Sequence, residues 1–306
     1  MIQLENVCRS FGDFNAVQDV SFSMDTGAGI TGLLGPNGAG KTTTMRMITG
    51  YLRPTSGDIR VAGMSVLDED QITEIKRTIG YLPETTPLYP EMLVSEYLDF
   101  MGRVRGVSEP DLRRAADEMV ERLDLSSHLY SPIGILSKGF RQRVALAGTL
   151  IHRPKVIILD EPTSGLDPNQ ISEIRHLIRD LGKTAALILS THILQEVEEL
   201  CSRVIVISRG RLVADAATDS LRSGHACSIV ARGQGVREKL ASFSAVRSVQ
   251  LVDKPAKDGF EQYLCELQEN APEKMFAFLA STGFEVREFA PVLRSLQSVF
   301  EELTGQ

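Results

Sequence analysis

The spacing of apolar positions changes along the chain, and each pattern predicts a different kind of structure. Within about the first 80 residues, short apolar or alternating runs stand between glycine and proline turns, which is typical of β-strands. One of these runs, Ile30–Leu34, leads directly into a glycine-rich turn, where we expect a helix to begin. The other strands predicted in this region are Ile2–Val7, Asp19–Met24 and Gly57–Val61.

A helical pattern follows between about residues 90 and 150. Apolar residues recur there every three or four positions, as in amphipathic helices, over Val94–Val104, Glu109–Leu123 and Gly139–Ile151. Two continuous apolar runs come next, Val156–Leu159 and Ala186–Ser190, which indicate strands buried on both faces. This order predicts an α/β core that carries a helical arm.

The pattern changes again after a turn at Arg209–Gly210. Alternating and amphipathic runs then follow the order β-α-β-β-α-β and are closed by a helix, which is a split βαβ, ferredoxin-like layout. We therefore expect a first domain at residues 1–215 and a small α+β domain at residues 222–306. The predicted strands are Ala226–Arg232, Val246–Asp253, Gln262–Gln268 and Phe284–Phe289, and the predicted helices are Val236–Phe243, Pro272–Thr282 and Ser295–Leu303.

The composition limits the possible partners. The chain has 306 residues and a formal net charge of -7, whereas a nucleic-acid-binding protein usually carries a basic stripe. The four cysteines are scattered, which fits neither a disulfide framework nor a zinc site and suits a reducing cytosol. We see no signal peptide and no apolar run near the roughly 20 residues of a membrane span. If a membrane is involved, another polypeptide should cross it.

The glycine-rich turn carries the clearest chemical signal. Its residues 35–42, Gly-Pro-Asn-Gly-Ala-Gly-Lys-Thr, fit the pattern G-x-x-x-x-G-K-[ST] of a phosphate-binding loop. Glycines let backbone N–H groups approach a triphosphate, Lys41 can reach the β- and γ-phosphates, and the Thr42 hydroxyl can ligate Mg²⁺. The predicted binding residues are Gly35, Pro36, Asn37, Gly38, Ala39, Gly40, Lys41, Thr42 and Thr43.

Two carboxylates end the buried strand that begins at Val156. Asp160 is placed to hold Mg²⁺, usually through water, and Glu161 should point elsewhere and polarise an attacking water. A carboxylate pair at a strand end is more often structural, but the phosphate-binding loop in the same chain favours catalysis.

A third motif separates this chain from other P-loop families. Residues 136–143, Leu-Ser-Lys-Gly-Phe-Arg-Gln-Arg, resemble the signature sequence of ABC ATPases, and Ser164-Gly-Leu-Asp167 and Leu189-Ser-Thr-His192 follow in that family's order. The resemblance covers residues 1 to about 215. It implies a P-loop ABC ATPase core with a β-rich subdomain and an α-helical subdomain at about residues 88–150.

The resemblance also implies roles for single residues. Phe11 resembles the aromatic residue that stacks on the adenine of ATP. Ser137 and Gly139 resemble the signature residues that close on the γ-phosphate bound to a second copy of the chain, and Asp167 resembles the aspartate that communicates across that dimer. His192 is similar to the switch histidine, so the expected catalytic set is Lys41, Glu161 and His192.

Two positions depart from the family pattern and point to a subfamily. Lys138-Gly-Phe140 stands where Gly-Gly-Gln is usual, and Gln142 is expected to replace part of the missing side chain. Glu84 stands where a Mg²⁺-contacting glutamine is expected, and its carboxylate can still offer an oxygen to the metal. Both variants resemble ABC-2 type exporters, most closely the gliding-motility-associated ATP-binding subunits, on residues 79–89, 136–143 and 167–170.

These resemblances imply an ATP- and Mg²⁺-dependent hydrolase at the cytoplasmic face of the inner membrane. Its partners would be an ABC-2 type permease and a second copy of itself, with no nucleic acid. The loop before the helical arm contains Leu88, Tyr89 and Met92, which we expect to be exposed and to contact the permease. The alternative is a soluble ABC ATPase that acts on ribosomes or DNA, which the single cassette and the absence of sustained heptads between Lys41 and Ser137 disfavour.

Overall fold

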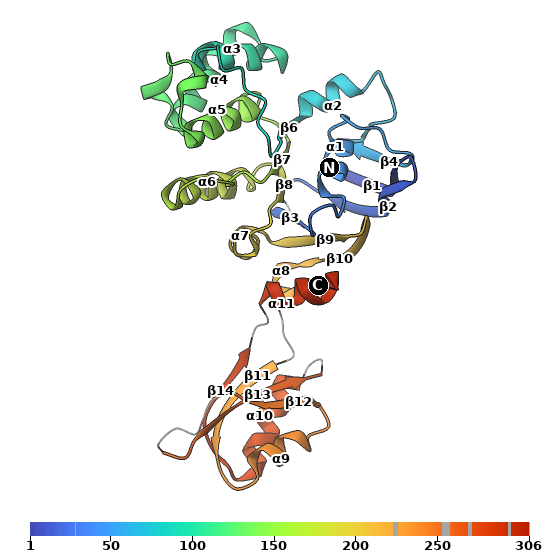
Figure 1. The fold of residues 1–306 in the computed structure, drawn as a ribbon, viewed down its shortest axis with the longest axis vertical. Coiled ribbons are helices and arrows are strands. Elements are labelled where there is room, and N and C mark those ends of the chain that lie inside the picture. Colours follow the sequence, from blue (N-terminus) through green and yellow to red (C-terminus); the bar gives the residue numbers. More distant parts are fainter. Residues whose placement is uncertain (28, 223–225, 253–257, 269–270, 293–294, 306) are drawn as a thin grey trace. The chain divides into compact units, whose positions relative to one another are not determined.

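The computed structural model describes residues 1–27, 29–222, 226–252, 258–268, 271–292 and 295–305. The chain forms two compact units, one of Met1–Thr218 with the end of the chain from Leu303, and one of Asp219–Glu302 (Figure 1). Among these described residues, no helix is long and apolar enough to cross a membrane.

A six-stranded sheet in the order β10-β9-β3-β8-β7-β6 forms the centre of the first unit. Its inner strands are parallel, and β10 pairs with β9 in the antiparallel sense. Every residue of β3, β7 and β8 is buried, as expected for a parallel sheet covered on both faces. The strands are β3 (Ile30–Leu34), β6 (Ile79–Leu82), β7 (Val156–Asp160), β8 (Ala186–Ser190), β9 (Arg203–Ser208) and β10 (Arg211–Ala217).

An antiparallel sheet in the order β2-β1-β4-β5 shares a hydrophobic core with α1 (Lys41–Ile48) and with strands of the central sheet. Strands β1 and β2 are longer than predicted, because they form a hairpin that continues to the register pair Phe11 and Phe14. The bounds are β1 (Ile2–Phe11), β2 (Phe14–Met24), β4 (Ser56–Val61), β5 (Met64–Ser65) and the following helix α2 (Ile72–Thr78).

Three helices form the arm that the helical pattern predicts: α3 (Val94–Val104), α4 (Glu109–Arg122) and α5 (Lys138–Leu150). Two short 3₁₀ turns, Ser126–His128 and Ile133–Ile135, connect α4 to α5. The three helices lie together at one side of the central sheet (Figure 1), so the predicted α/β core with a helical arm is confirmed.

Four helices of the described residues were not predicted: α2, α6 (Pro168–Leu181), α7 (Leu194–Leu200) and α8 (Thr218–Arg222). The sequence signal for α6 is present, since Asp167 and Gln170 form a capping box and Pro168 occupies the first turn. Helix α6 buries Ile174, Leu177, Ile178 and Leu181 at helical spacing.

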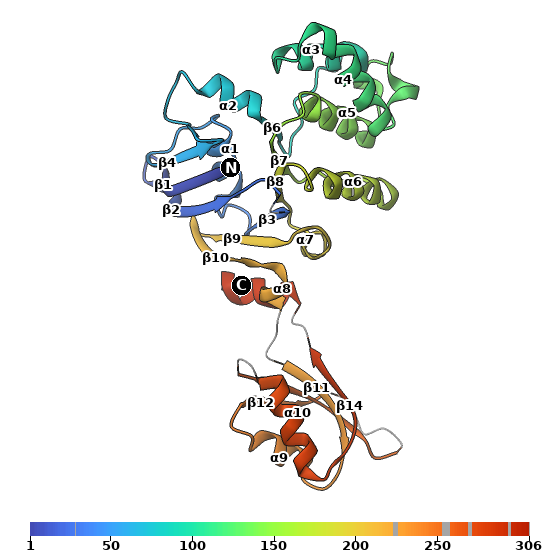
Figure 2. The same cartoon turned by 180° about the vertical axis from the view of Figure 1, so that it is seen from behind.

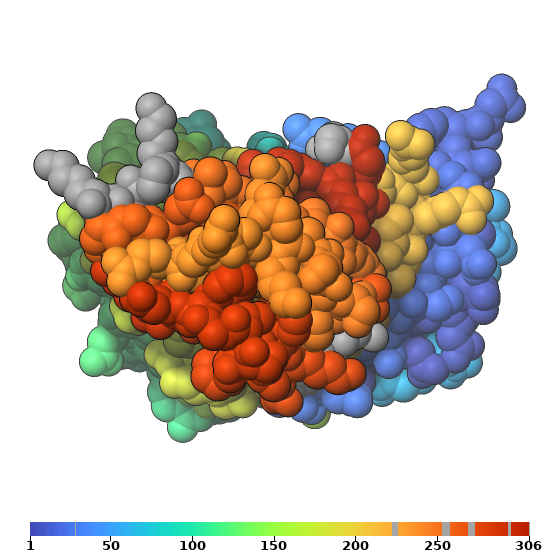
Figure 3. Space-filling view, turned by 90° about the horizontal axis from the view of Figure 1, so that it is seen from below, coloured from blue at the N-terminus to red at the C-terminus, as the bar shows by residue number. Residues whose placement is uncertain are grey.

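The second unit has the predicted β-α-β-β-α-β order (Figure 2). Strand β13 lies between β11 and β12, which makes the split βαβ, and β14 pairs with the other side of β11. The hydrophobic core of this unit joins its sheet to α9 and α10. Figure 3 shows a face of this unit that is formed by orange and red segments. Asp253, the predicted end of β12, lies outside the described residues. The bounds are β11 (Ala226–Arg232), α9 (Val236–Ala241), β12 (Val246–Leu251), β13 (Glu261–Leu267), α10 (Ala271–Thr282) and β14 (Glu285–Val292), with α8 (Thr218–Arg222) before them and α11 (Leu296–Thr304) after them.

Candidate functional site

The loop between β3 and α1 has a backbone that only glycine allows at two positions. Gly40 has φ of 109°, and a Cβ there would lie 2.6 Å from the carbonyl oxygen of Ala16. A Cβ at Gly35 would collide with the carbonyl oxygen of Ile207 on β9. The loop therefore packs directly on backbone at both ends, and the N–H groups at the start of α1 can face a phosphate.

The Lys41 side chain bonds back to the loop that precedes it. Its Nζ donates hydrogen bonds to the carbonyl oxygens of Gly35 (2.7 Å) and Pro36 (3.2 Å). Burial lowers the pKa of the Lys41 amine, and the carboxylates around it oppose that shift, Glu161 most strongly. The amine is thus a half-buried cation that faces acidic groups, and a phosphate could replace its carbonyl partners.

Asp160 and Thr42 make the metal side of the site. Asp160 is the last residue of β7, and the Thr42 hydroxyl donates to its Oδ2 at 3.3 Å. Burial raises the pKa of Asp160, and the neighbouring carboxylate of Glu84 adds to this shift. A bound cation would favour the ionised form of Asp160.

This donor set fits Mg²⁺ bound together with a phosphate. Among the described residues, no three His, Cys, Asp or Glu side chains are placed to hold a metal by themselves. Mg²⁺ usually keeps several waters and takes only one or two carboxylates plus substrate phosphates. Thr42, Asp160 and Glu84 would supply such a partial set.

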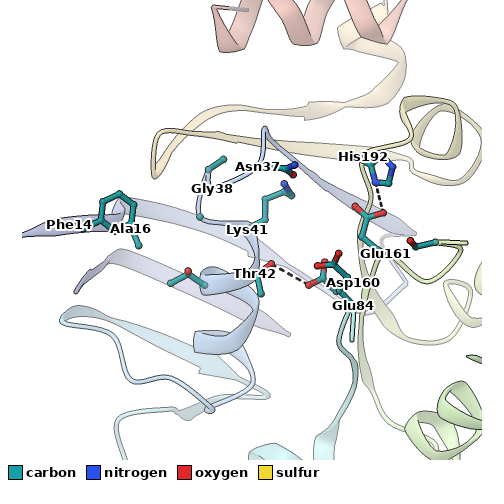
Figure 4. Close-up of a pocket in the computed structure, with 14 residues that line it drawn as sticks. Phe14, Ala16, Asn37, Gly38, Lys41, Thr42, Glu84, Asp160, Glu161 and His192 are labelled. Atoms are coloured by element: carbon teal, nitrogen blue, oxygen red, sulfur yellow. Dashed lines mark hydrogen bonds and ion pairs between the residues drawn. The ribbon is translucent and has the colours of Figure 1, made fainter. Parts of the chain in front are cut away.

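Glu161 has an unusual backbone that turns it away from Asp160. Its φ is 51°, in the left-handed region that non-glycine residues rarely adopt, and its N–H donates to the carbonyl oxygen of Ser190 on β8 at 2.9 Å. The His192 Nδ1 donates to Glu161 Oε2 at 2.7 Å, and the two side chains point toward each other in Figure 4. Burial raises the pKa of Glu161, and the bond from His192 opposes that shift. A raised pKa suits a carboxylate that accepts a proton from water.

These groups surround one pocket of about 530 Å³ (Figure 4). Carboxyl ends of parallel strands meet at one edge of a sheet, and β6, β7 and β8 bring Glu84, Glu161 and His192 to that edge. Phe14, Ala16 and Ser164 also line the pocket, although the sequence analysis did not select them. The predicted site residues that line it are Asn37, Gly38, Ala39, Gly40, Lys41, Thr42, Thr43, Glu84, Asp160, Glu161 and His192.

The remaining predicted residues do not line this pocket: Phe11, Gly35, Pro36, Ser137, Gly139 and Asp167. The Phe11 ring is 46% exposed and has the Arg9 guanidinium over it at 4.6 Å from its centroid. Phe14, opposite Phe11 in the hairpin, lines the pocket instead. The alternation of apolar and polar residues along a strand cannot reveal which residue at the end of the β1–β2 hairpin faces the loop between β3 and α1.

The signature stretch caps helix α5. Ser137 is the N-cap, and its hydroxyl accepts the Phe140 N–H at 3.3 Å, so the helix begins at Lys138 rather than at Gly139. The interpretation of Gln142 was wrong: its side chain is buried and donates to the carbonyl oxygen of Pro162 at 2.9 Å. It therefore cannot replace a side chain that reaches out to a nucleotide.

Asp167 has the same kind of position at the start of α6. Its side chain accepts the N–H groups of Asn169 and Gln170, so it is the N-cap of that helix. Ser137 and Asp167 thus cap the N-termini of α5 and α6, and both lie outside the pocket.

Comparisons with known proteins agree with this geometry. The family model described as ABC transporter matches residues 17–164. The ABC transporter ATP-binding protein YxlF of Bacillus subtilis is 40% identical over 212 residues, which are 69% of each chain. The ATP-binding protein YhaQ of the same organism is 31% identical over 100% of this chain and 99% of its own length. A solved structure of MJ0796, a dimeric ABC transporter cassette, superposes with a TM-score of 0.63 at 25% identity over 71% of this chain and 98% of that one. The chain therefore belongs to the family of ABC transporter ATP-binding subunits, and it is an ABC-type ATPase.

Proposed function

We propose that this chain hydrolyses ATP as one half of a nucleotide-sandwich dimer and thereby drives an ABC-2 type permease in the export direction. The observation that carries the dimer is the composition of the pocket. It contains a triphosphate loop, a carboxylate pair and a histidine, while Ser137 and Gly139 lie outside it. A second copy, related by two-fold symmetry, would bring these two residues to the open side of each pocket.

In the hydrolytic step, the chain binds and orients the phosphates of ATP and accepts a proton from the attacking water. The loop amides and Lys41 hold the phosphates, and bound Mg²⁺ would neutralise charge that develops on them. Glu161 accepts a proton from the water that attacks the γ-phosphorus. His192 holds the Glu161 carboxylate in place through the 2.7 Å hydrogen bond.

The adenine platform is the first point that an experiment can resolve. Phe14→Ala should raise the Kd of ATP about 5- to 150-fold, because stacking of a base on an aromatic ring contributes about 1–3 kcal/mol. Phe11→Ala removes the same kind of ring from the opposite residue of the same register pair and is the matched control. Titration with a fluorescent ATP analogue measures both. If Phe11→Ala weakens binding more than Phe14→Ala does, Phe11 is the platform.

The ABC-2 assignment rests on the two sequence departures, Glu84 and Phe140. Phe140 packs edge-on against His128 at 4.2 Å between ring centroids, so it serves the helical arm. Glu84 lies beside the metal donors and adds a negative charge that a glutamine would not have. In this proposal the subunit sits at the cytoplasmic face of the inner membrane and contacts the permease through the arm.

The loop between β6 and α3 is the proposed contact. Tyr89 is 50% exposed, and its ring packs edge-on against Phe100 of α3 at 5.7 Å. Leu88 and Met92 are half-buried rather than exposed. This corrects the expectation that both side chains are exposed together with Tyr89. A groove of about 440 Å³ opens beside the loop and is lined by Tyr89. One exposed aromatic at the edge of a groove supports a docking surface for a short permease segment.

Tyr89→Glu should leave the basal ATPase rate of the purified subunit within about twofold of the wild type, because Tyr89 lies outside the nucleotide pocket. It should abolish stimulation of that rate by the permease, since a charge would be buried at the contact. Tyr89→Phe is the matched control and should keep both. The assay uses a candidate ABC-2 type permease reconstituted in liposomes with the subunit. A normal stimulated rate in Tyr89→Glu would place the coupling surface elsewhere.

A further inference from the structure

A fully buried carboxylate lies behind the switch histidine. Glu196, on α7, has no exposed surface, yet none of the roles assigned above uses it. A carboxylate buried at this depth must be compensated by hydrogen bonds or by an opposite charge. The hydrogen-bond and ion-pair partners of Glu196 therefore indicate its role.

Glu196 joins two segments that end in site residues. Its Oε2 accepts a hydrogen bond from the Thr191 hydroxyl at 3.0 Å. On its other side, Arg175 of α6 places Nη2 3.5 Å from Oε1, and the same guanidinium donates to Glu199 at 2.8 Å. The carboxylate thus connects the helix that begins after Asp167 to the loop that carries His192.

The hydroxyl of Thr191 closes a turn around His192. It has one proton, which goes to Glu196, so a lone pair remains to accept the N–H of Ile193 at 3.1 Å. The residues before and after His192 are therefore tied to each other through this hydroxyl. Glu196 decides which way the hydroxyl points.

The His192 ring has few contacts that could fix its direction apart from this turn. Its side chain is 66% exposed, so packing does not fix its direction. The imidazole ring bonds to Glu161, which requires the backbone turn to aim the ring at that carboxylate. A misplacement of about 1 Å in such a geometry can cost about 10²-fold in rate.

We propose that Arg175, Glu196 and Thr191 are positioning residues for ATP hydrolysis: the ion pair of Arg175 with the buried Glu196 orients the Thr191 hydroxyl, and this hydroxyl fixes the turn that holds His192 against Glu161. None of the three touches the nucleotide pocket. Their loss should therefore lower kcat and leave ATP binding nearly unchanged. The proposal concerns the ATPase step alone and is independent of the permease and of the direction of transport.

The test compares Thr191→Val with Thr191→Ser in the full chain. Valine has nearly the shape of threonine but lacks both hydrogen bonds, whereas serine keeps the hydroxyl. We expect Thr191→Val to lower kcat about 10- to 50-fold with the Kd of ATP within twofold, and Thr191→Ser to keep kcat within about threefold. The proposal is overturned if Thr191→Val keeps kcat within twofold, or if both variants lose kcat equally.

A double-mutant cycle separates positioning from general destabilisation. In a His192→Ala background, Thr191→Val should cause less than a twofold further loss, because the hydroxyl acts only through His192. An additional loss equal to that seen in the wild type would mean that Thr191 acts on the fold and not on His192. Thermal unfolding of each variant shows that the compared proteins are folded. Glu196→Gln offers a second series, since its amide oxygen can still accept from Thr191, and it should keep more activity than Glu196→Ala.

Discussion

Glu161→Gln should retain ATP binding and lower turnover by about 10²- to 10⁴-fold, which is the usual contribution of a general base. Glutamine has the same shape but cannot accept the proton of the attacking water. The replacement is also conservative in structure, because the bond from the Glu161 N–H to the Ser190 carbonyl oxygen belongs to the backbone and does not depend on the side chain. Turnover is measured as phosphate release, and binding as the Kd of ATP.

The same variant should accumulate as an ATP-bound dimer, because a sandwich that forms on ATP opens only after hydrolysis. Size-exclusion chromatography with and without ATP detects this species. Glu69→Gln, on the exposed surface, is the control for a lost charge and should behave as the wild type. Near-normal turnover of Glu161→Gln would remove Glu161 from the role of base.

Mixing two inactive variants should restore part of the activity. Lys41→Ala removes the phosphate-binding amine, and Gly139→Asp places a carboxylate where a γ-phosphate should approach in trans. A mixed dimer then has one site with both defects and one intact site. With random pairing, half of the dimers are mixed and have one working site of two, so we expect roughly a quarter of the wild-type rate. Each variant alone should be near background.

The structure supplies the control for the Gly139 variant. A Cβ at Gly139 would collide with the Gln170 side chain, which belongs to the capping box of α6. Gln170→Ala removes that contact and shows how much of the effect comes from a disturbed cap, for which about 1 kcal/mol of stability is usual. If the mixture of Lys41→Ala and Gly139→Asp stays inactive although both proteins are folded, the site is not completed in trans. Full activity of a diluted monomer would contradict the dimer as well.

The sequence by itself determined the features that depend on neighbours along the chain. The phosphate-binding loop could be predicted because its residues act through consecutive backbone amides, and a local glycine pattern fixes their conformation. The helices of the arm followed from apolar spacing, as did the strands of the second unit. Helix α6 could also have been predicted from the sequence, since Asp167 and Gln170 form a capping box.

Only the tertiary structure decided which side chains meet from distant segments. The alternation in β1 and β2 could not show that Phe14 rather than Phe11 lines the pocket, because the facing loop belongs to another sheet. A glutamine side chain can contact a nucleotide, but the packing of α5 buries the side chain of Gln142 against Pro162. The pairing of Arg175 with Glu196 joins two helices whose separate sequences do not specify their distance. Local hydrogen bonding is encoded within a few residues, whereas burial and long-range pairing depend on how the sheet brings its strands together.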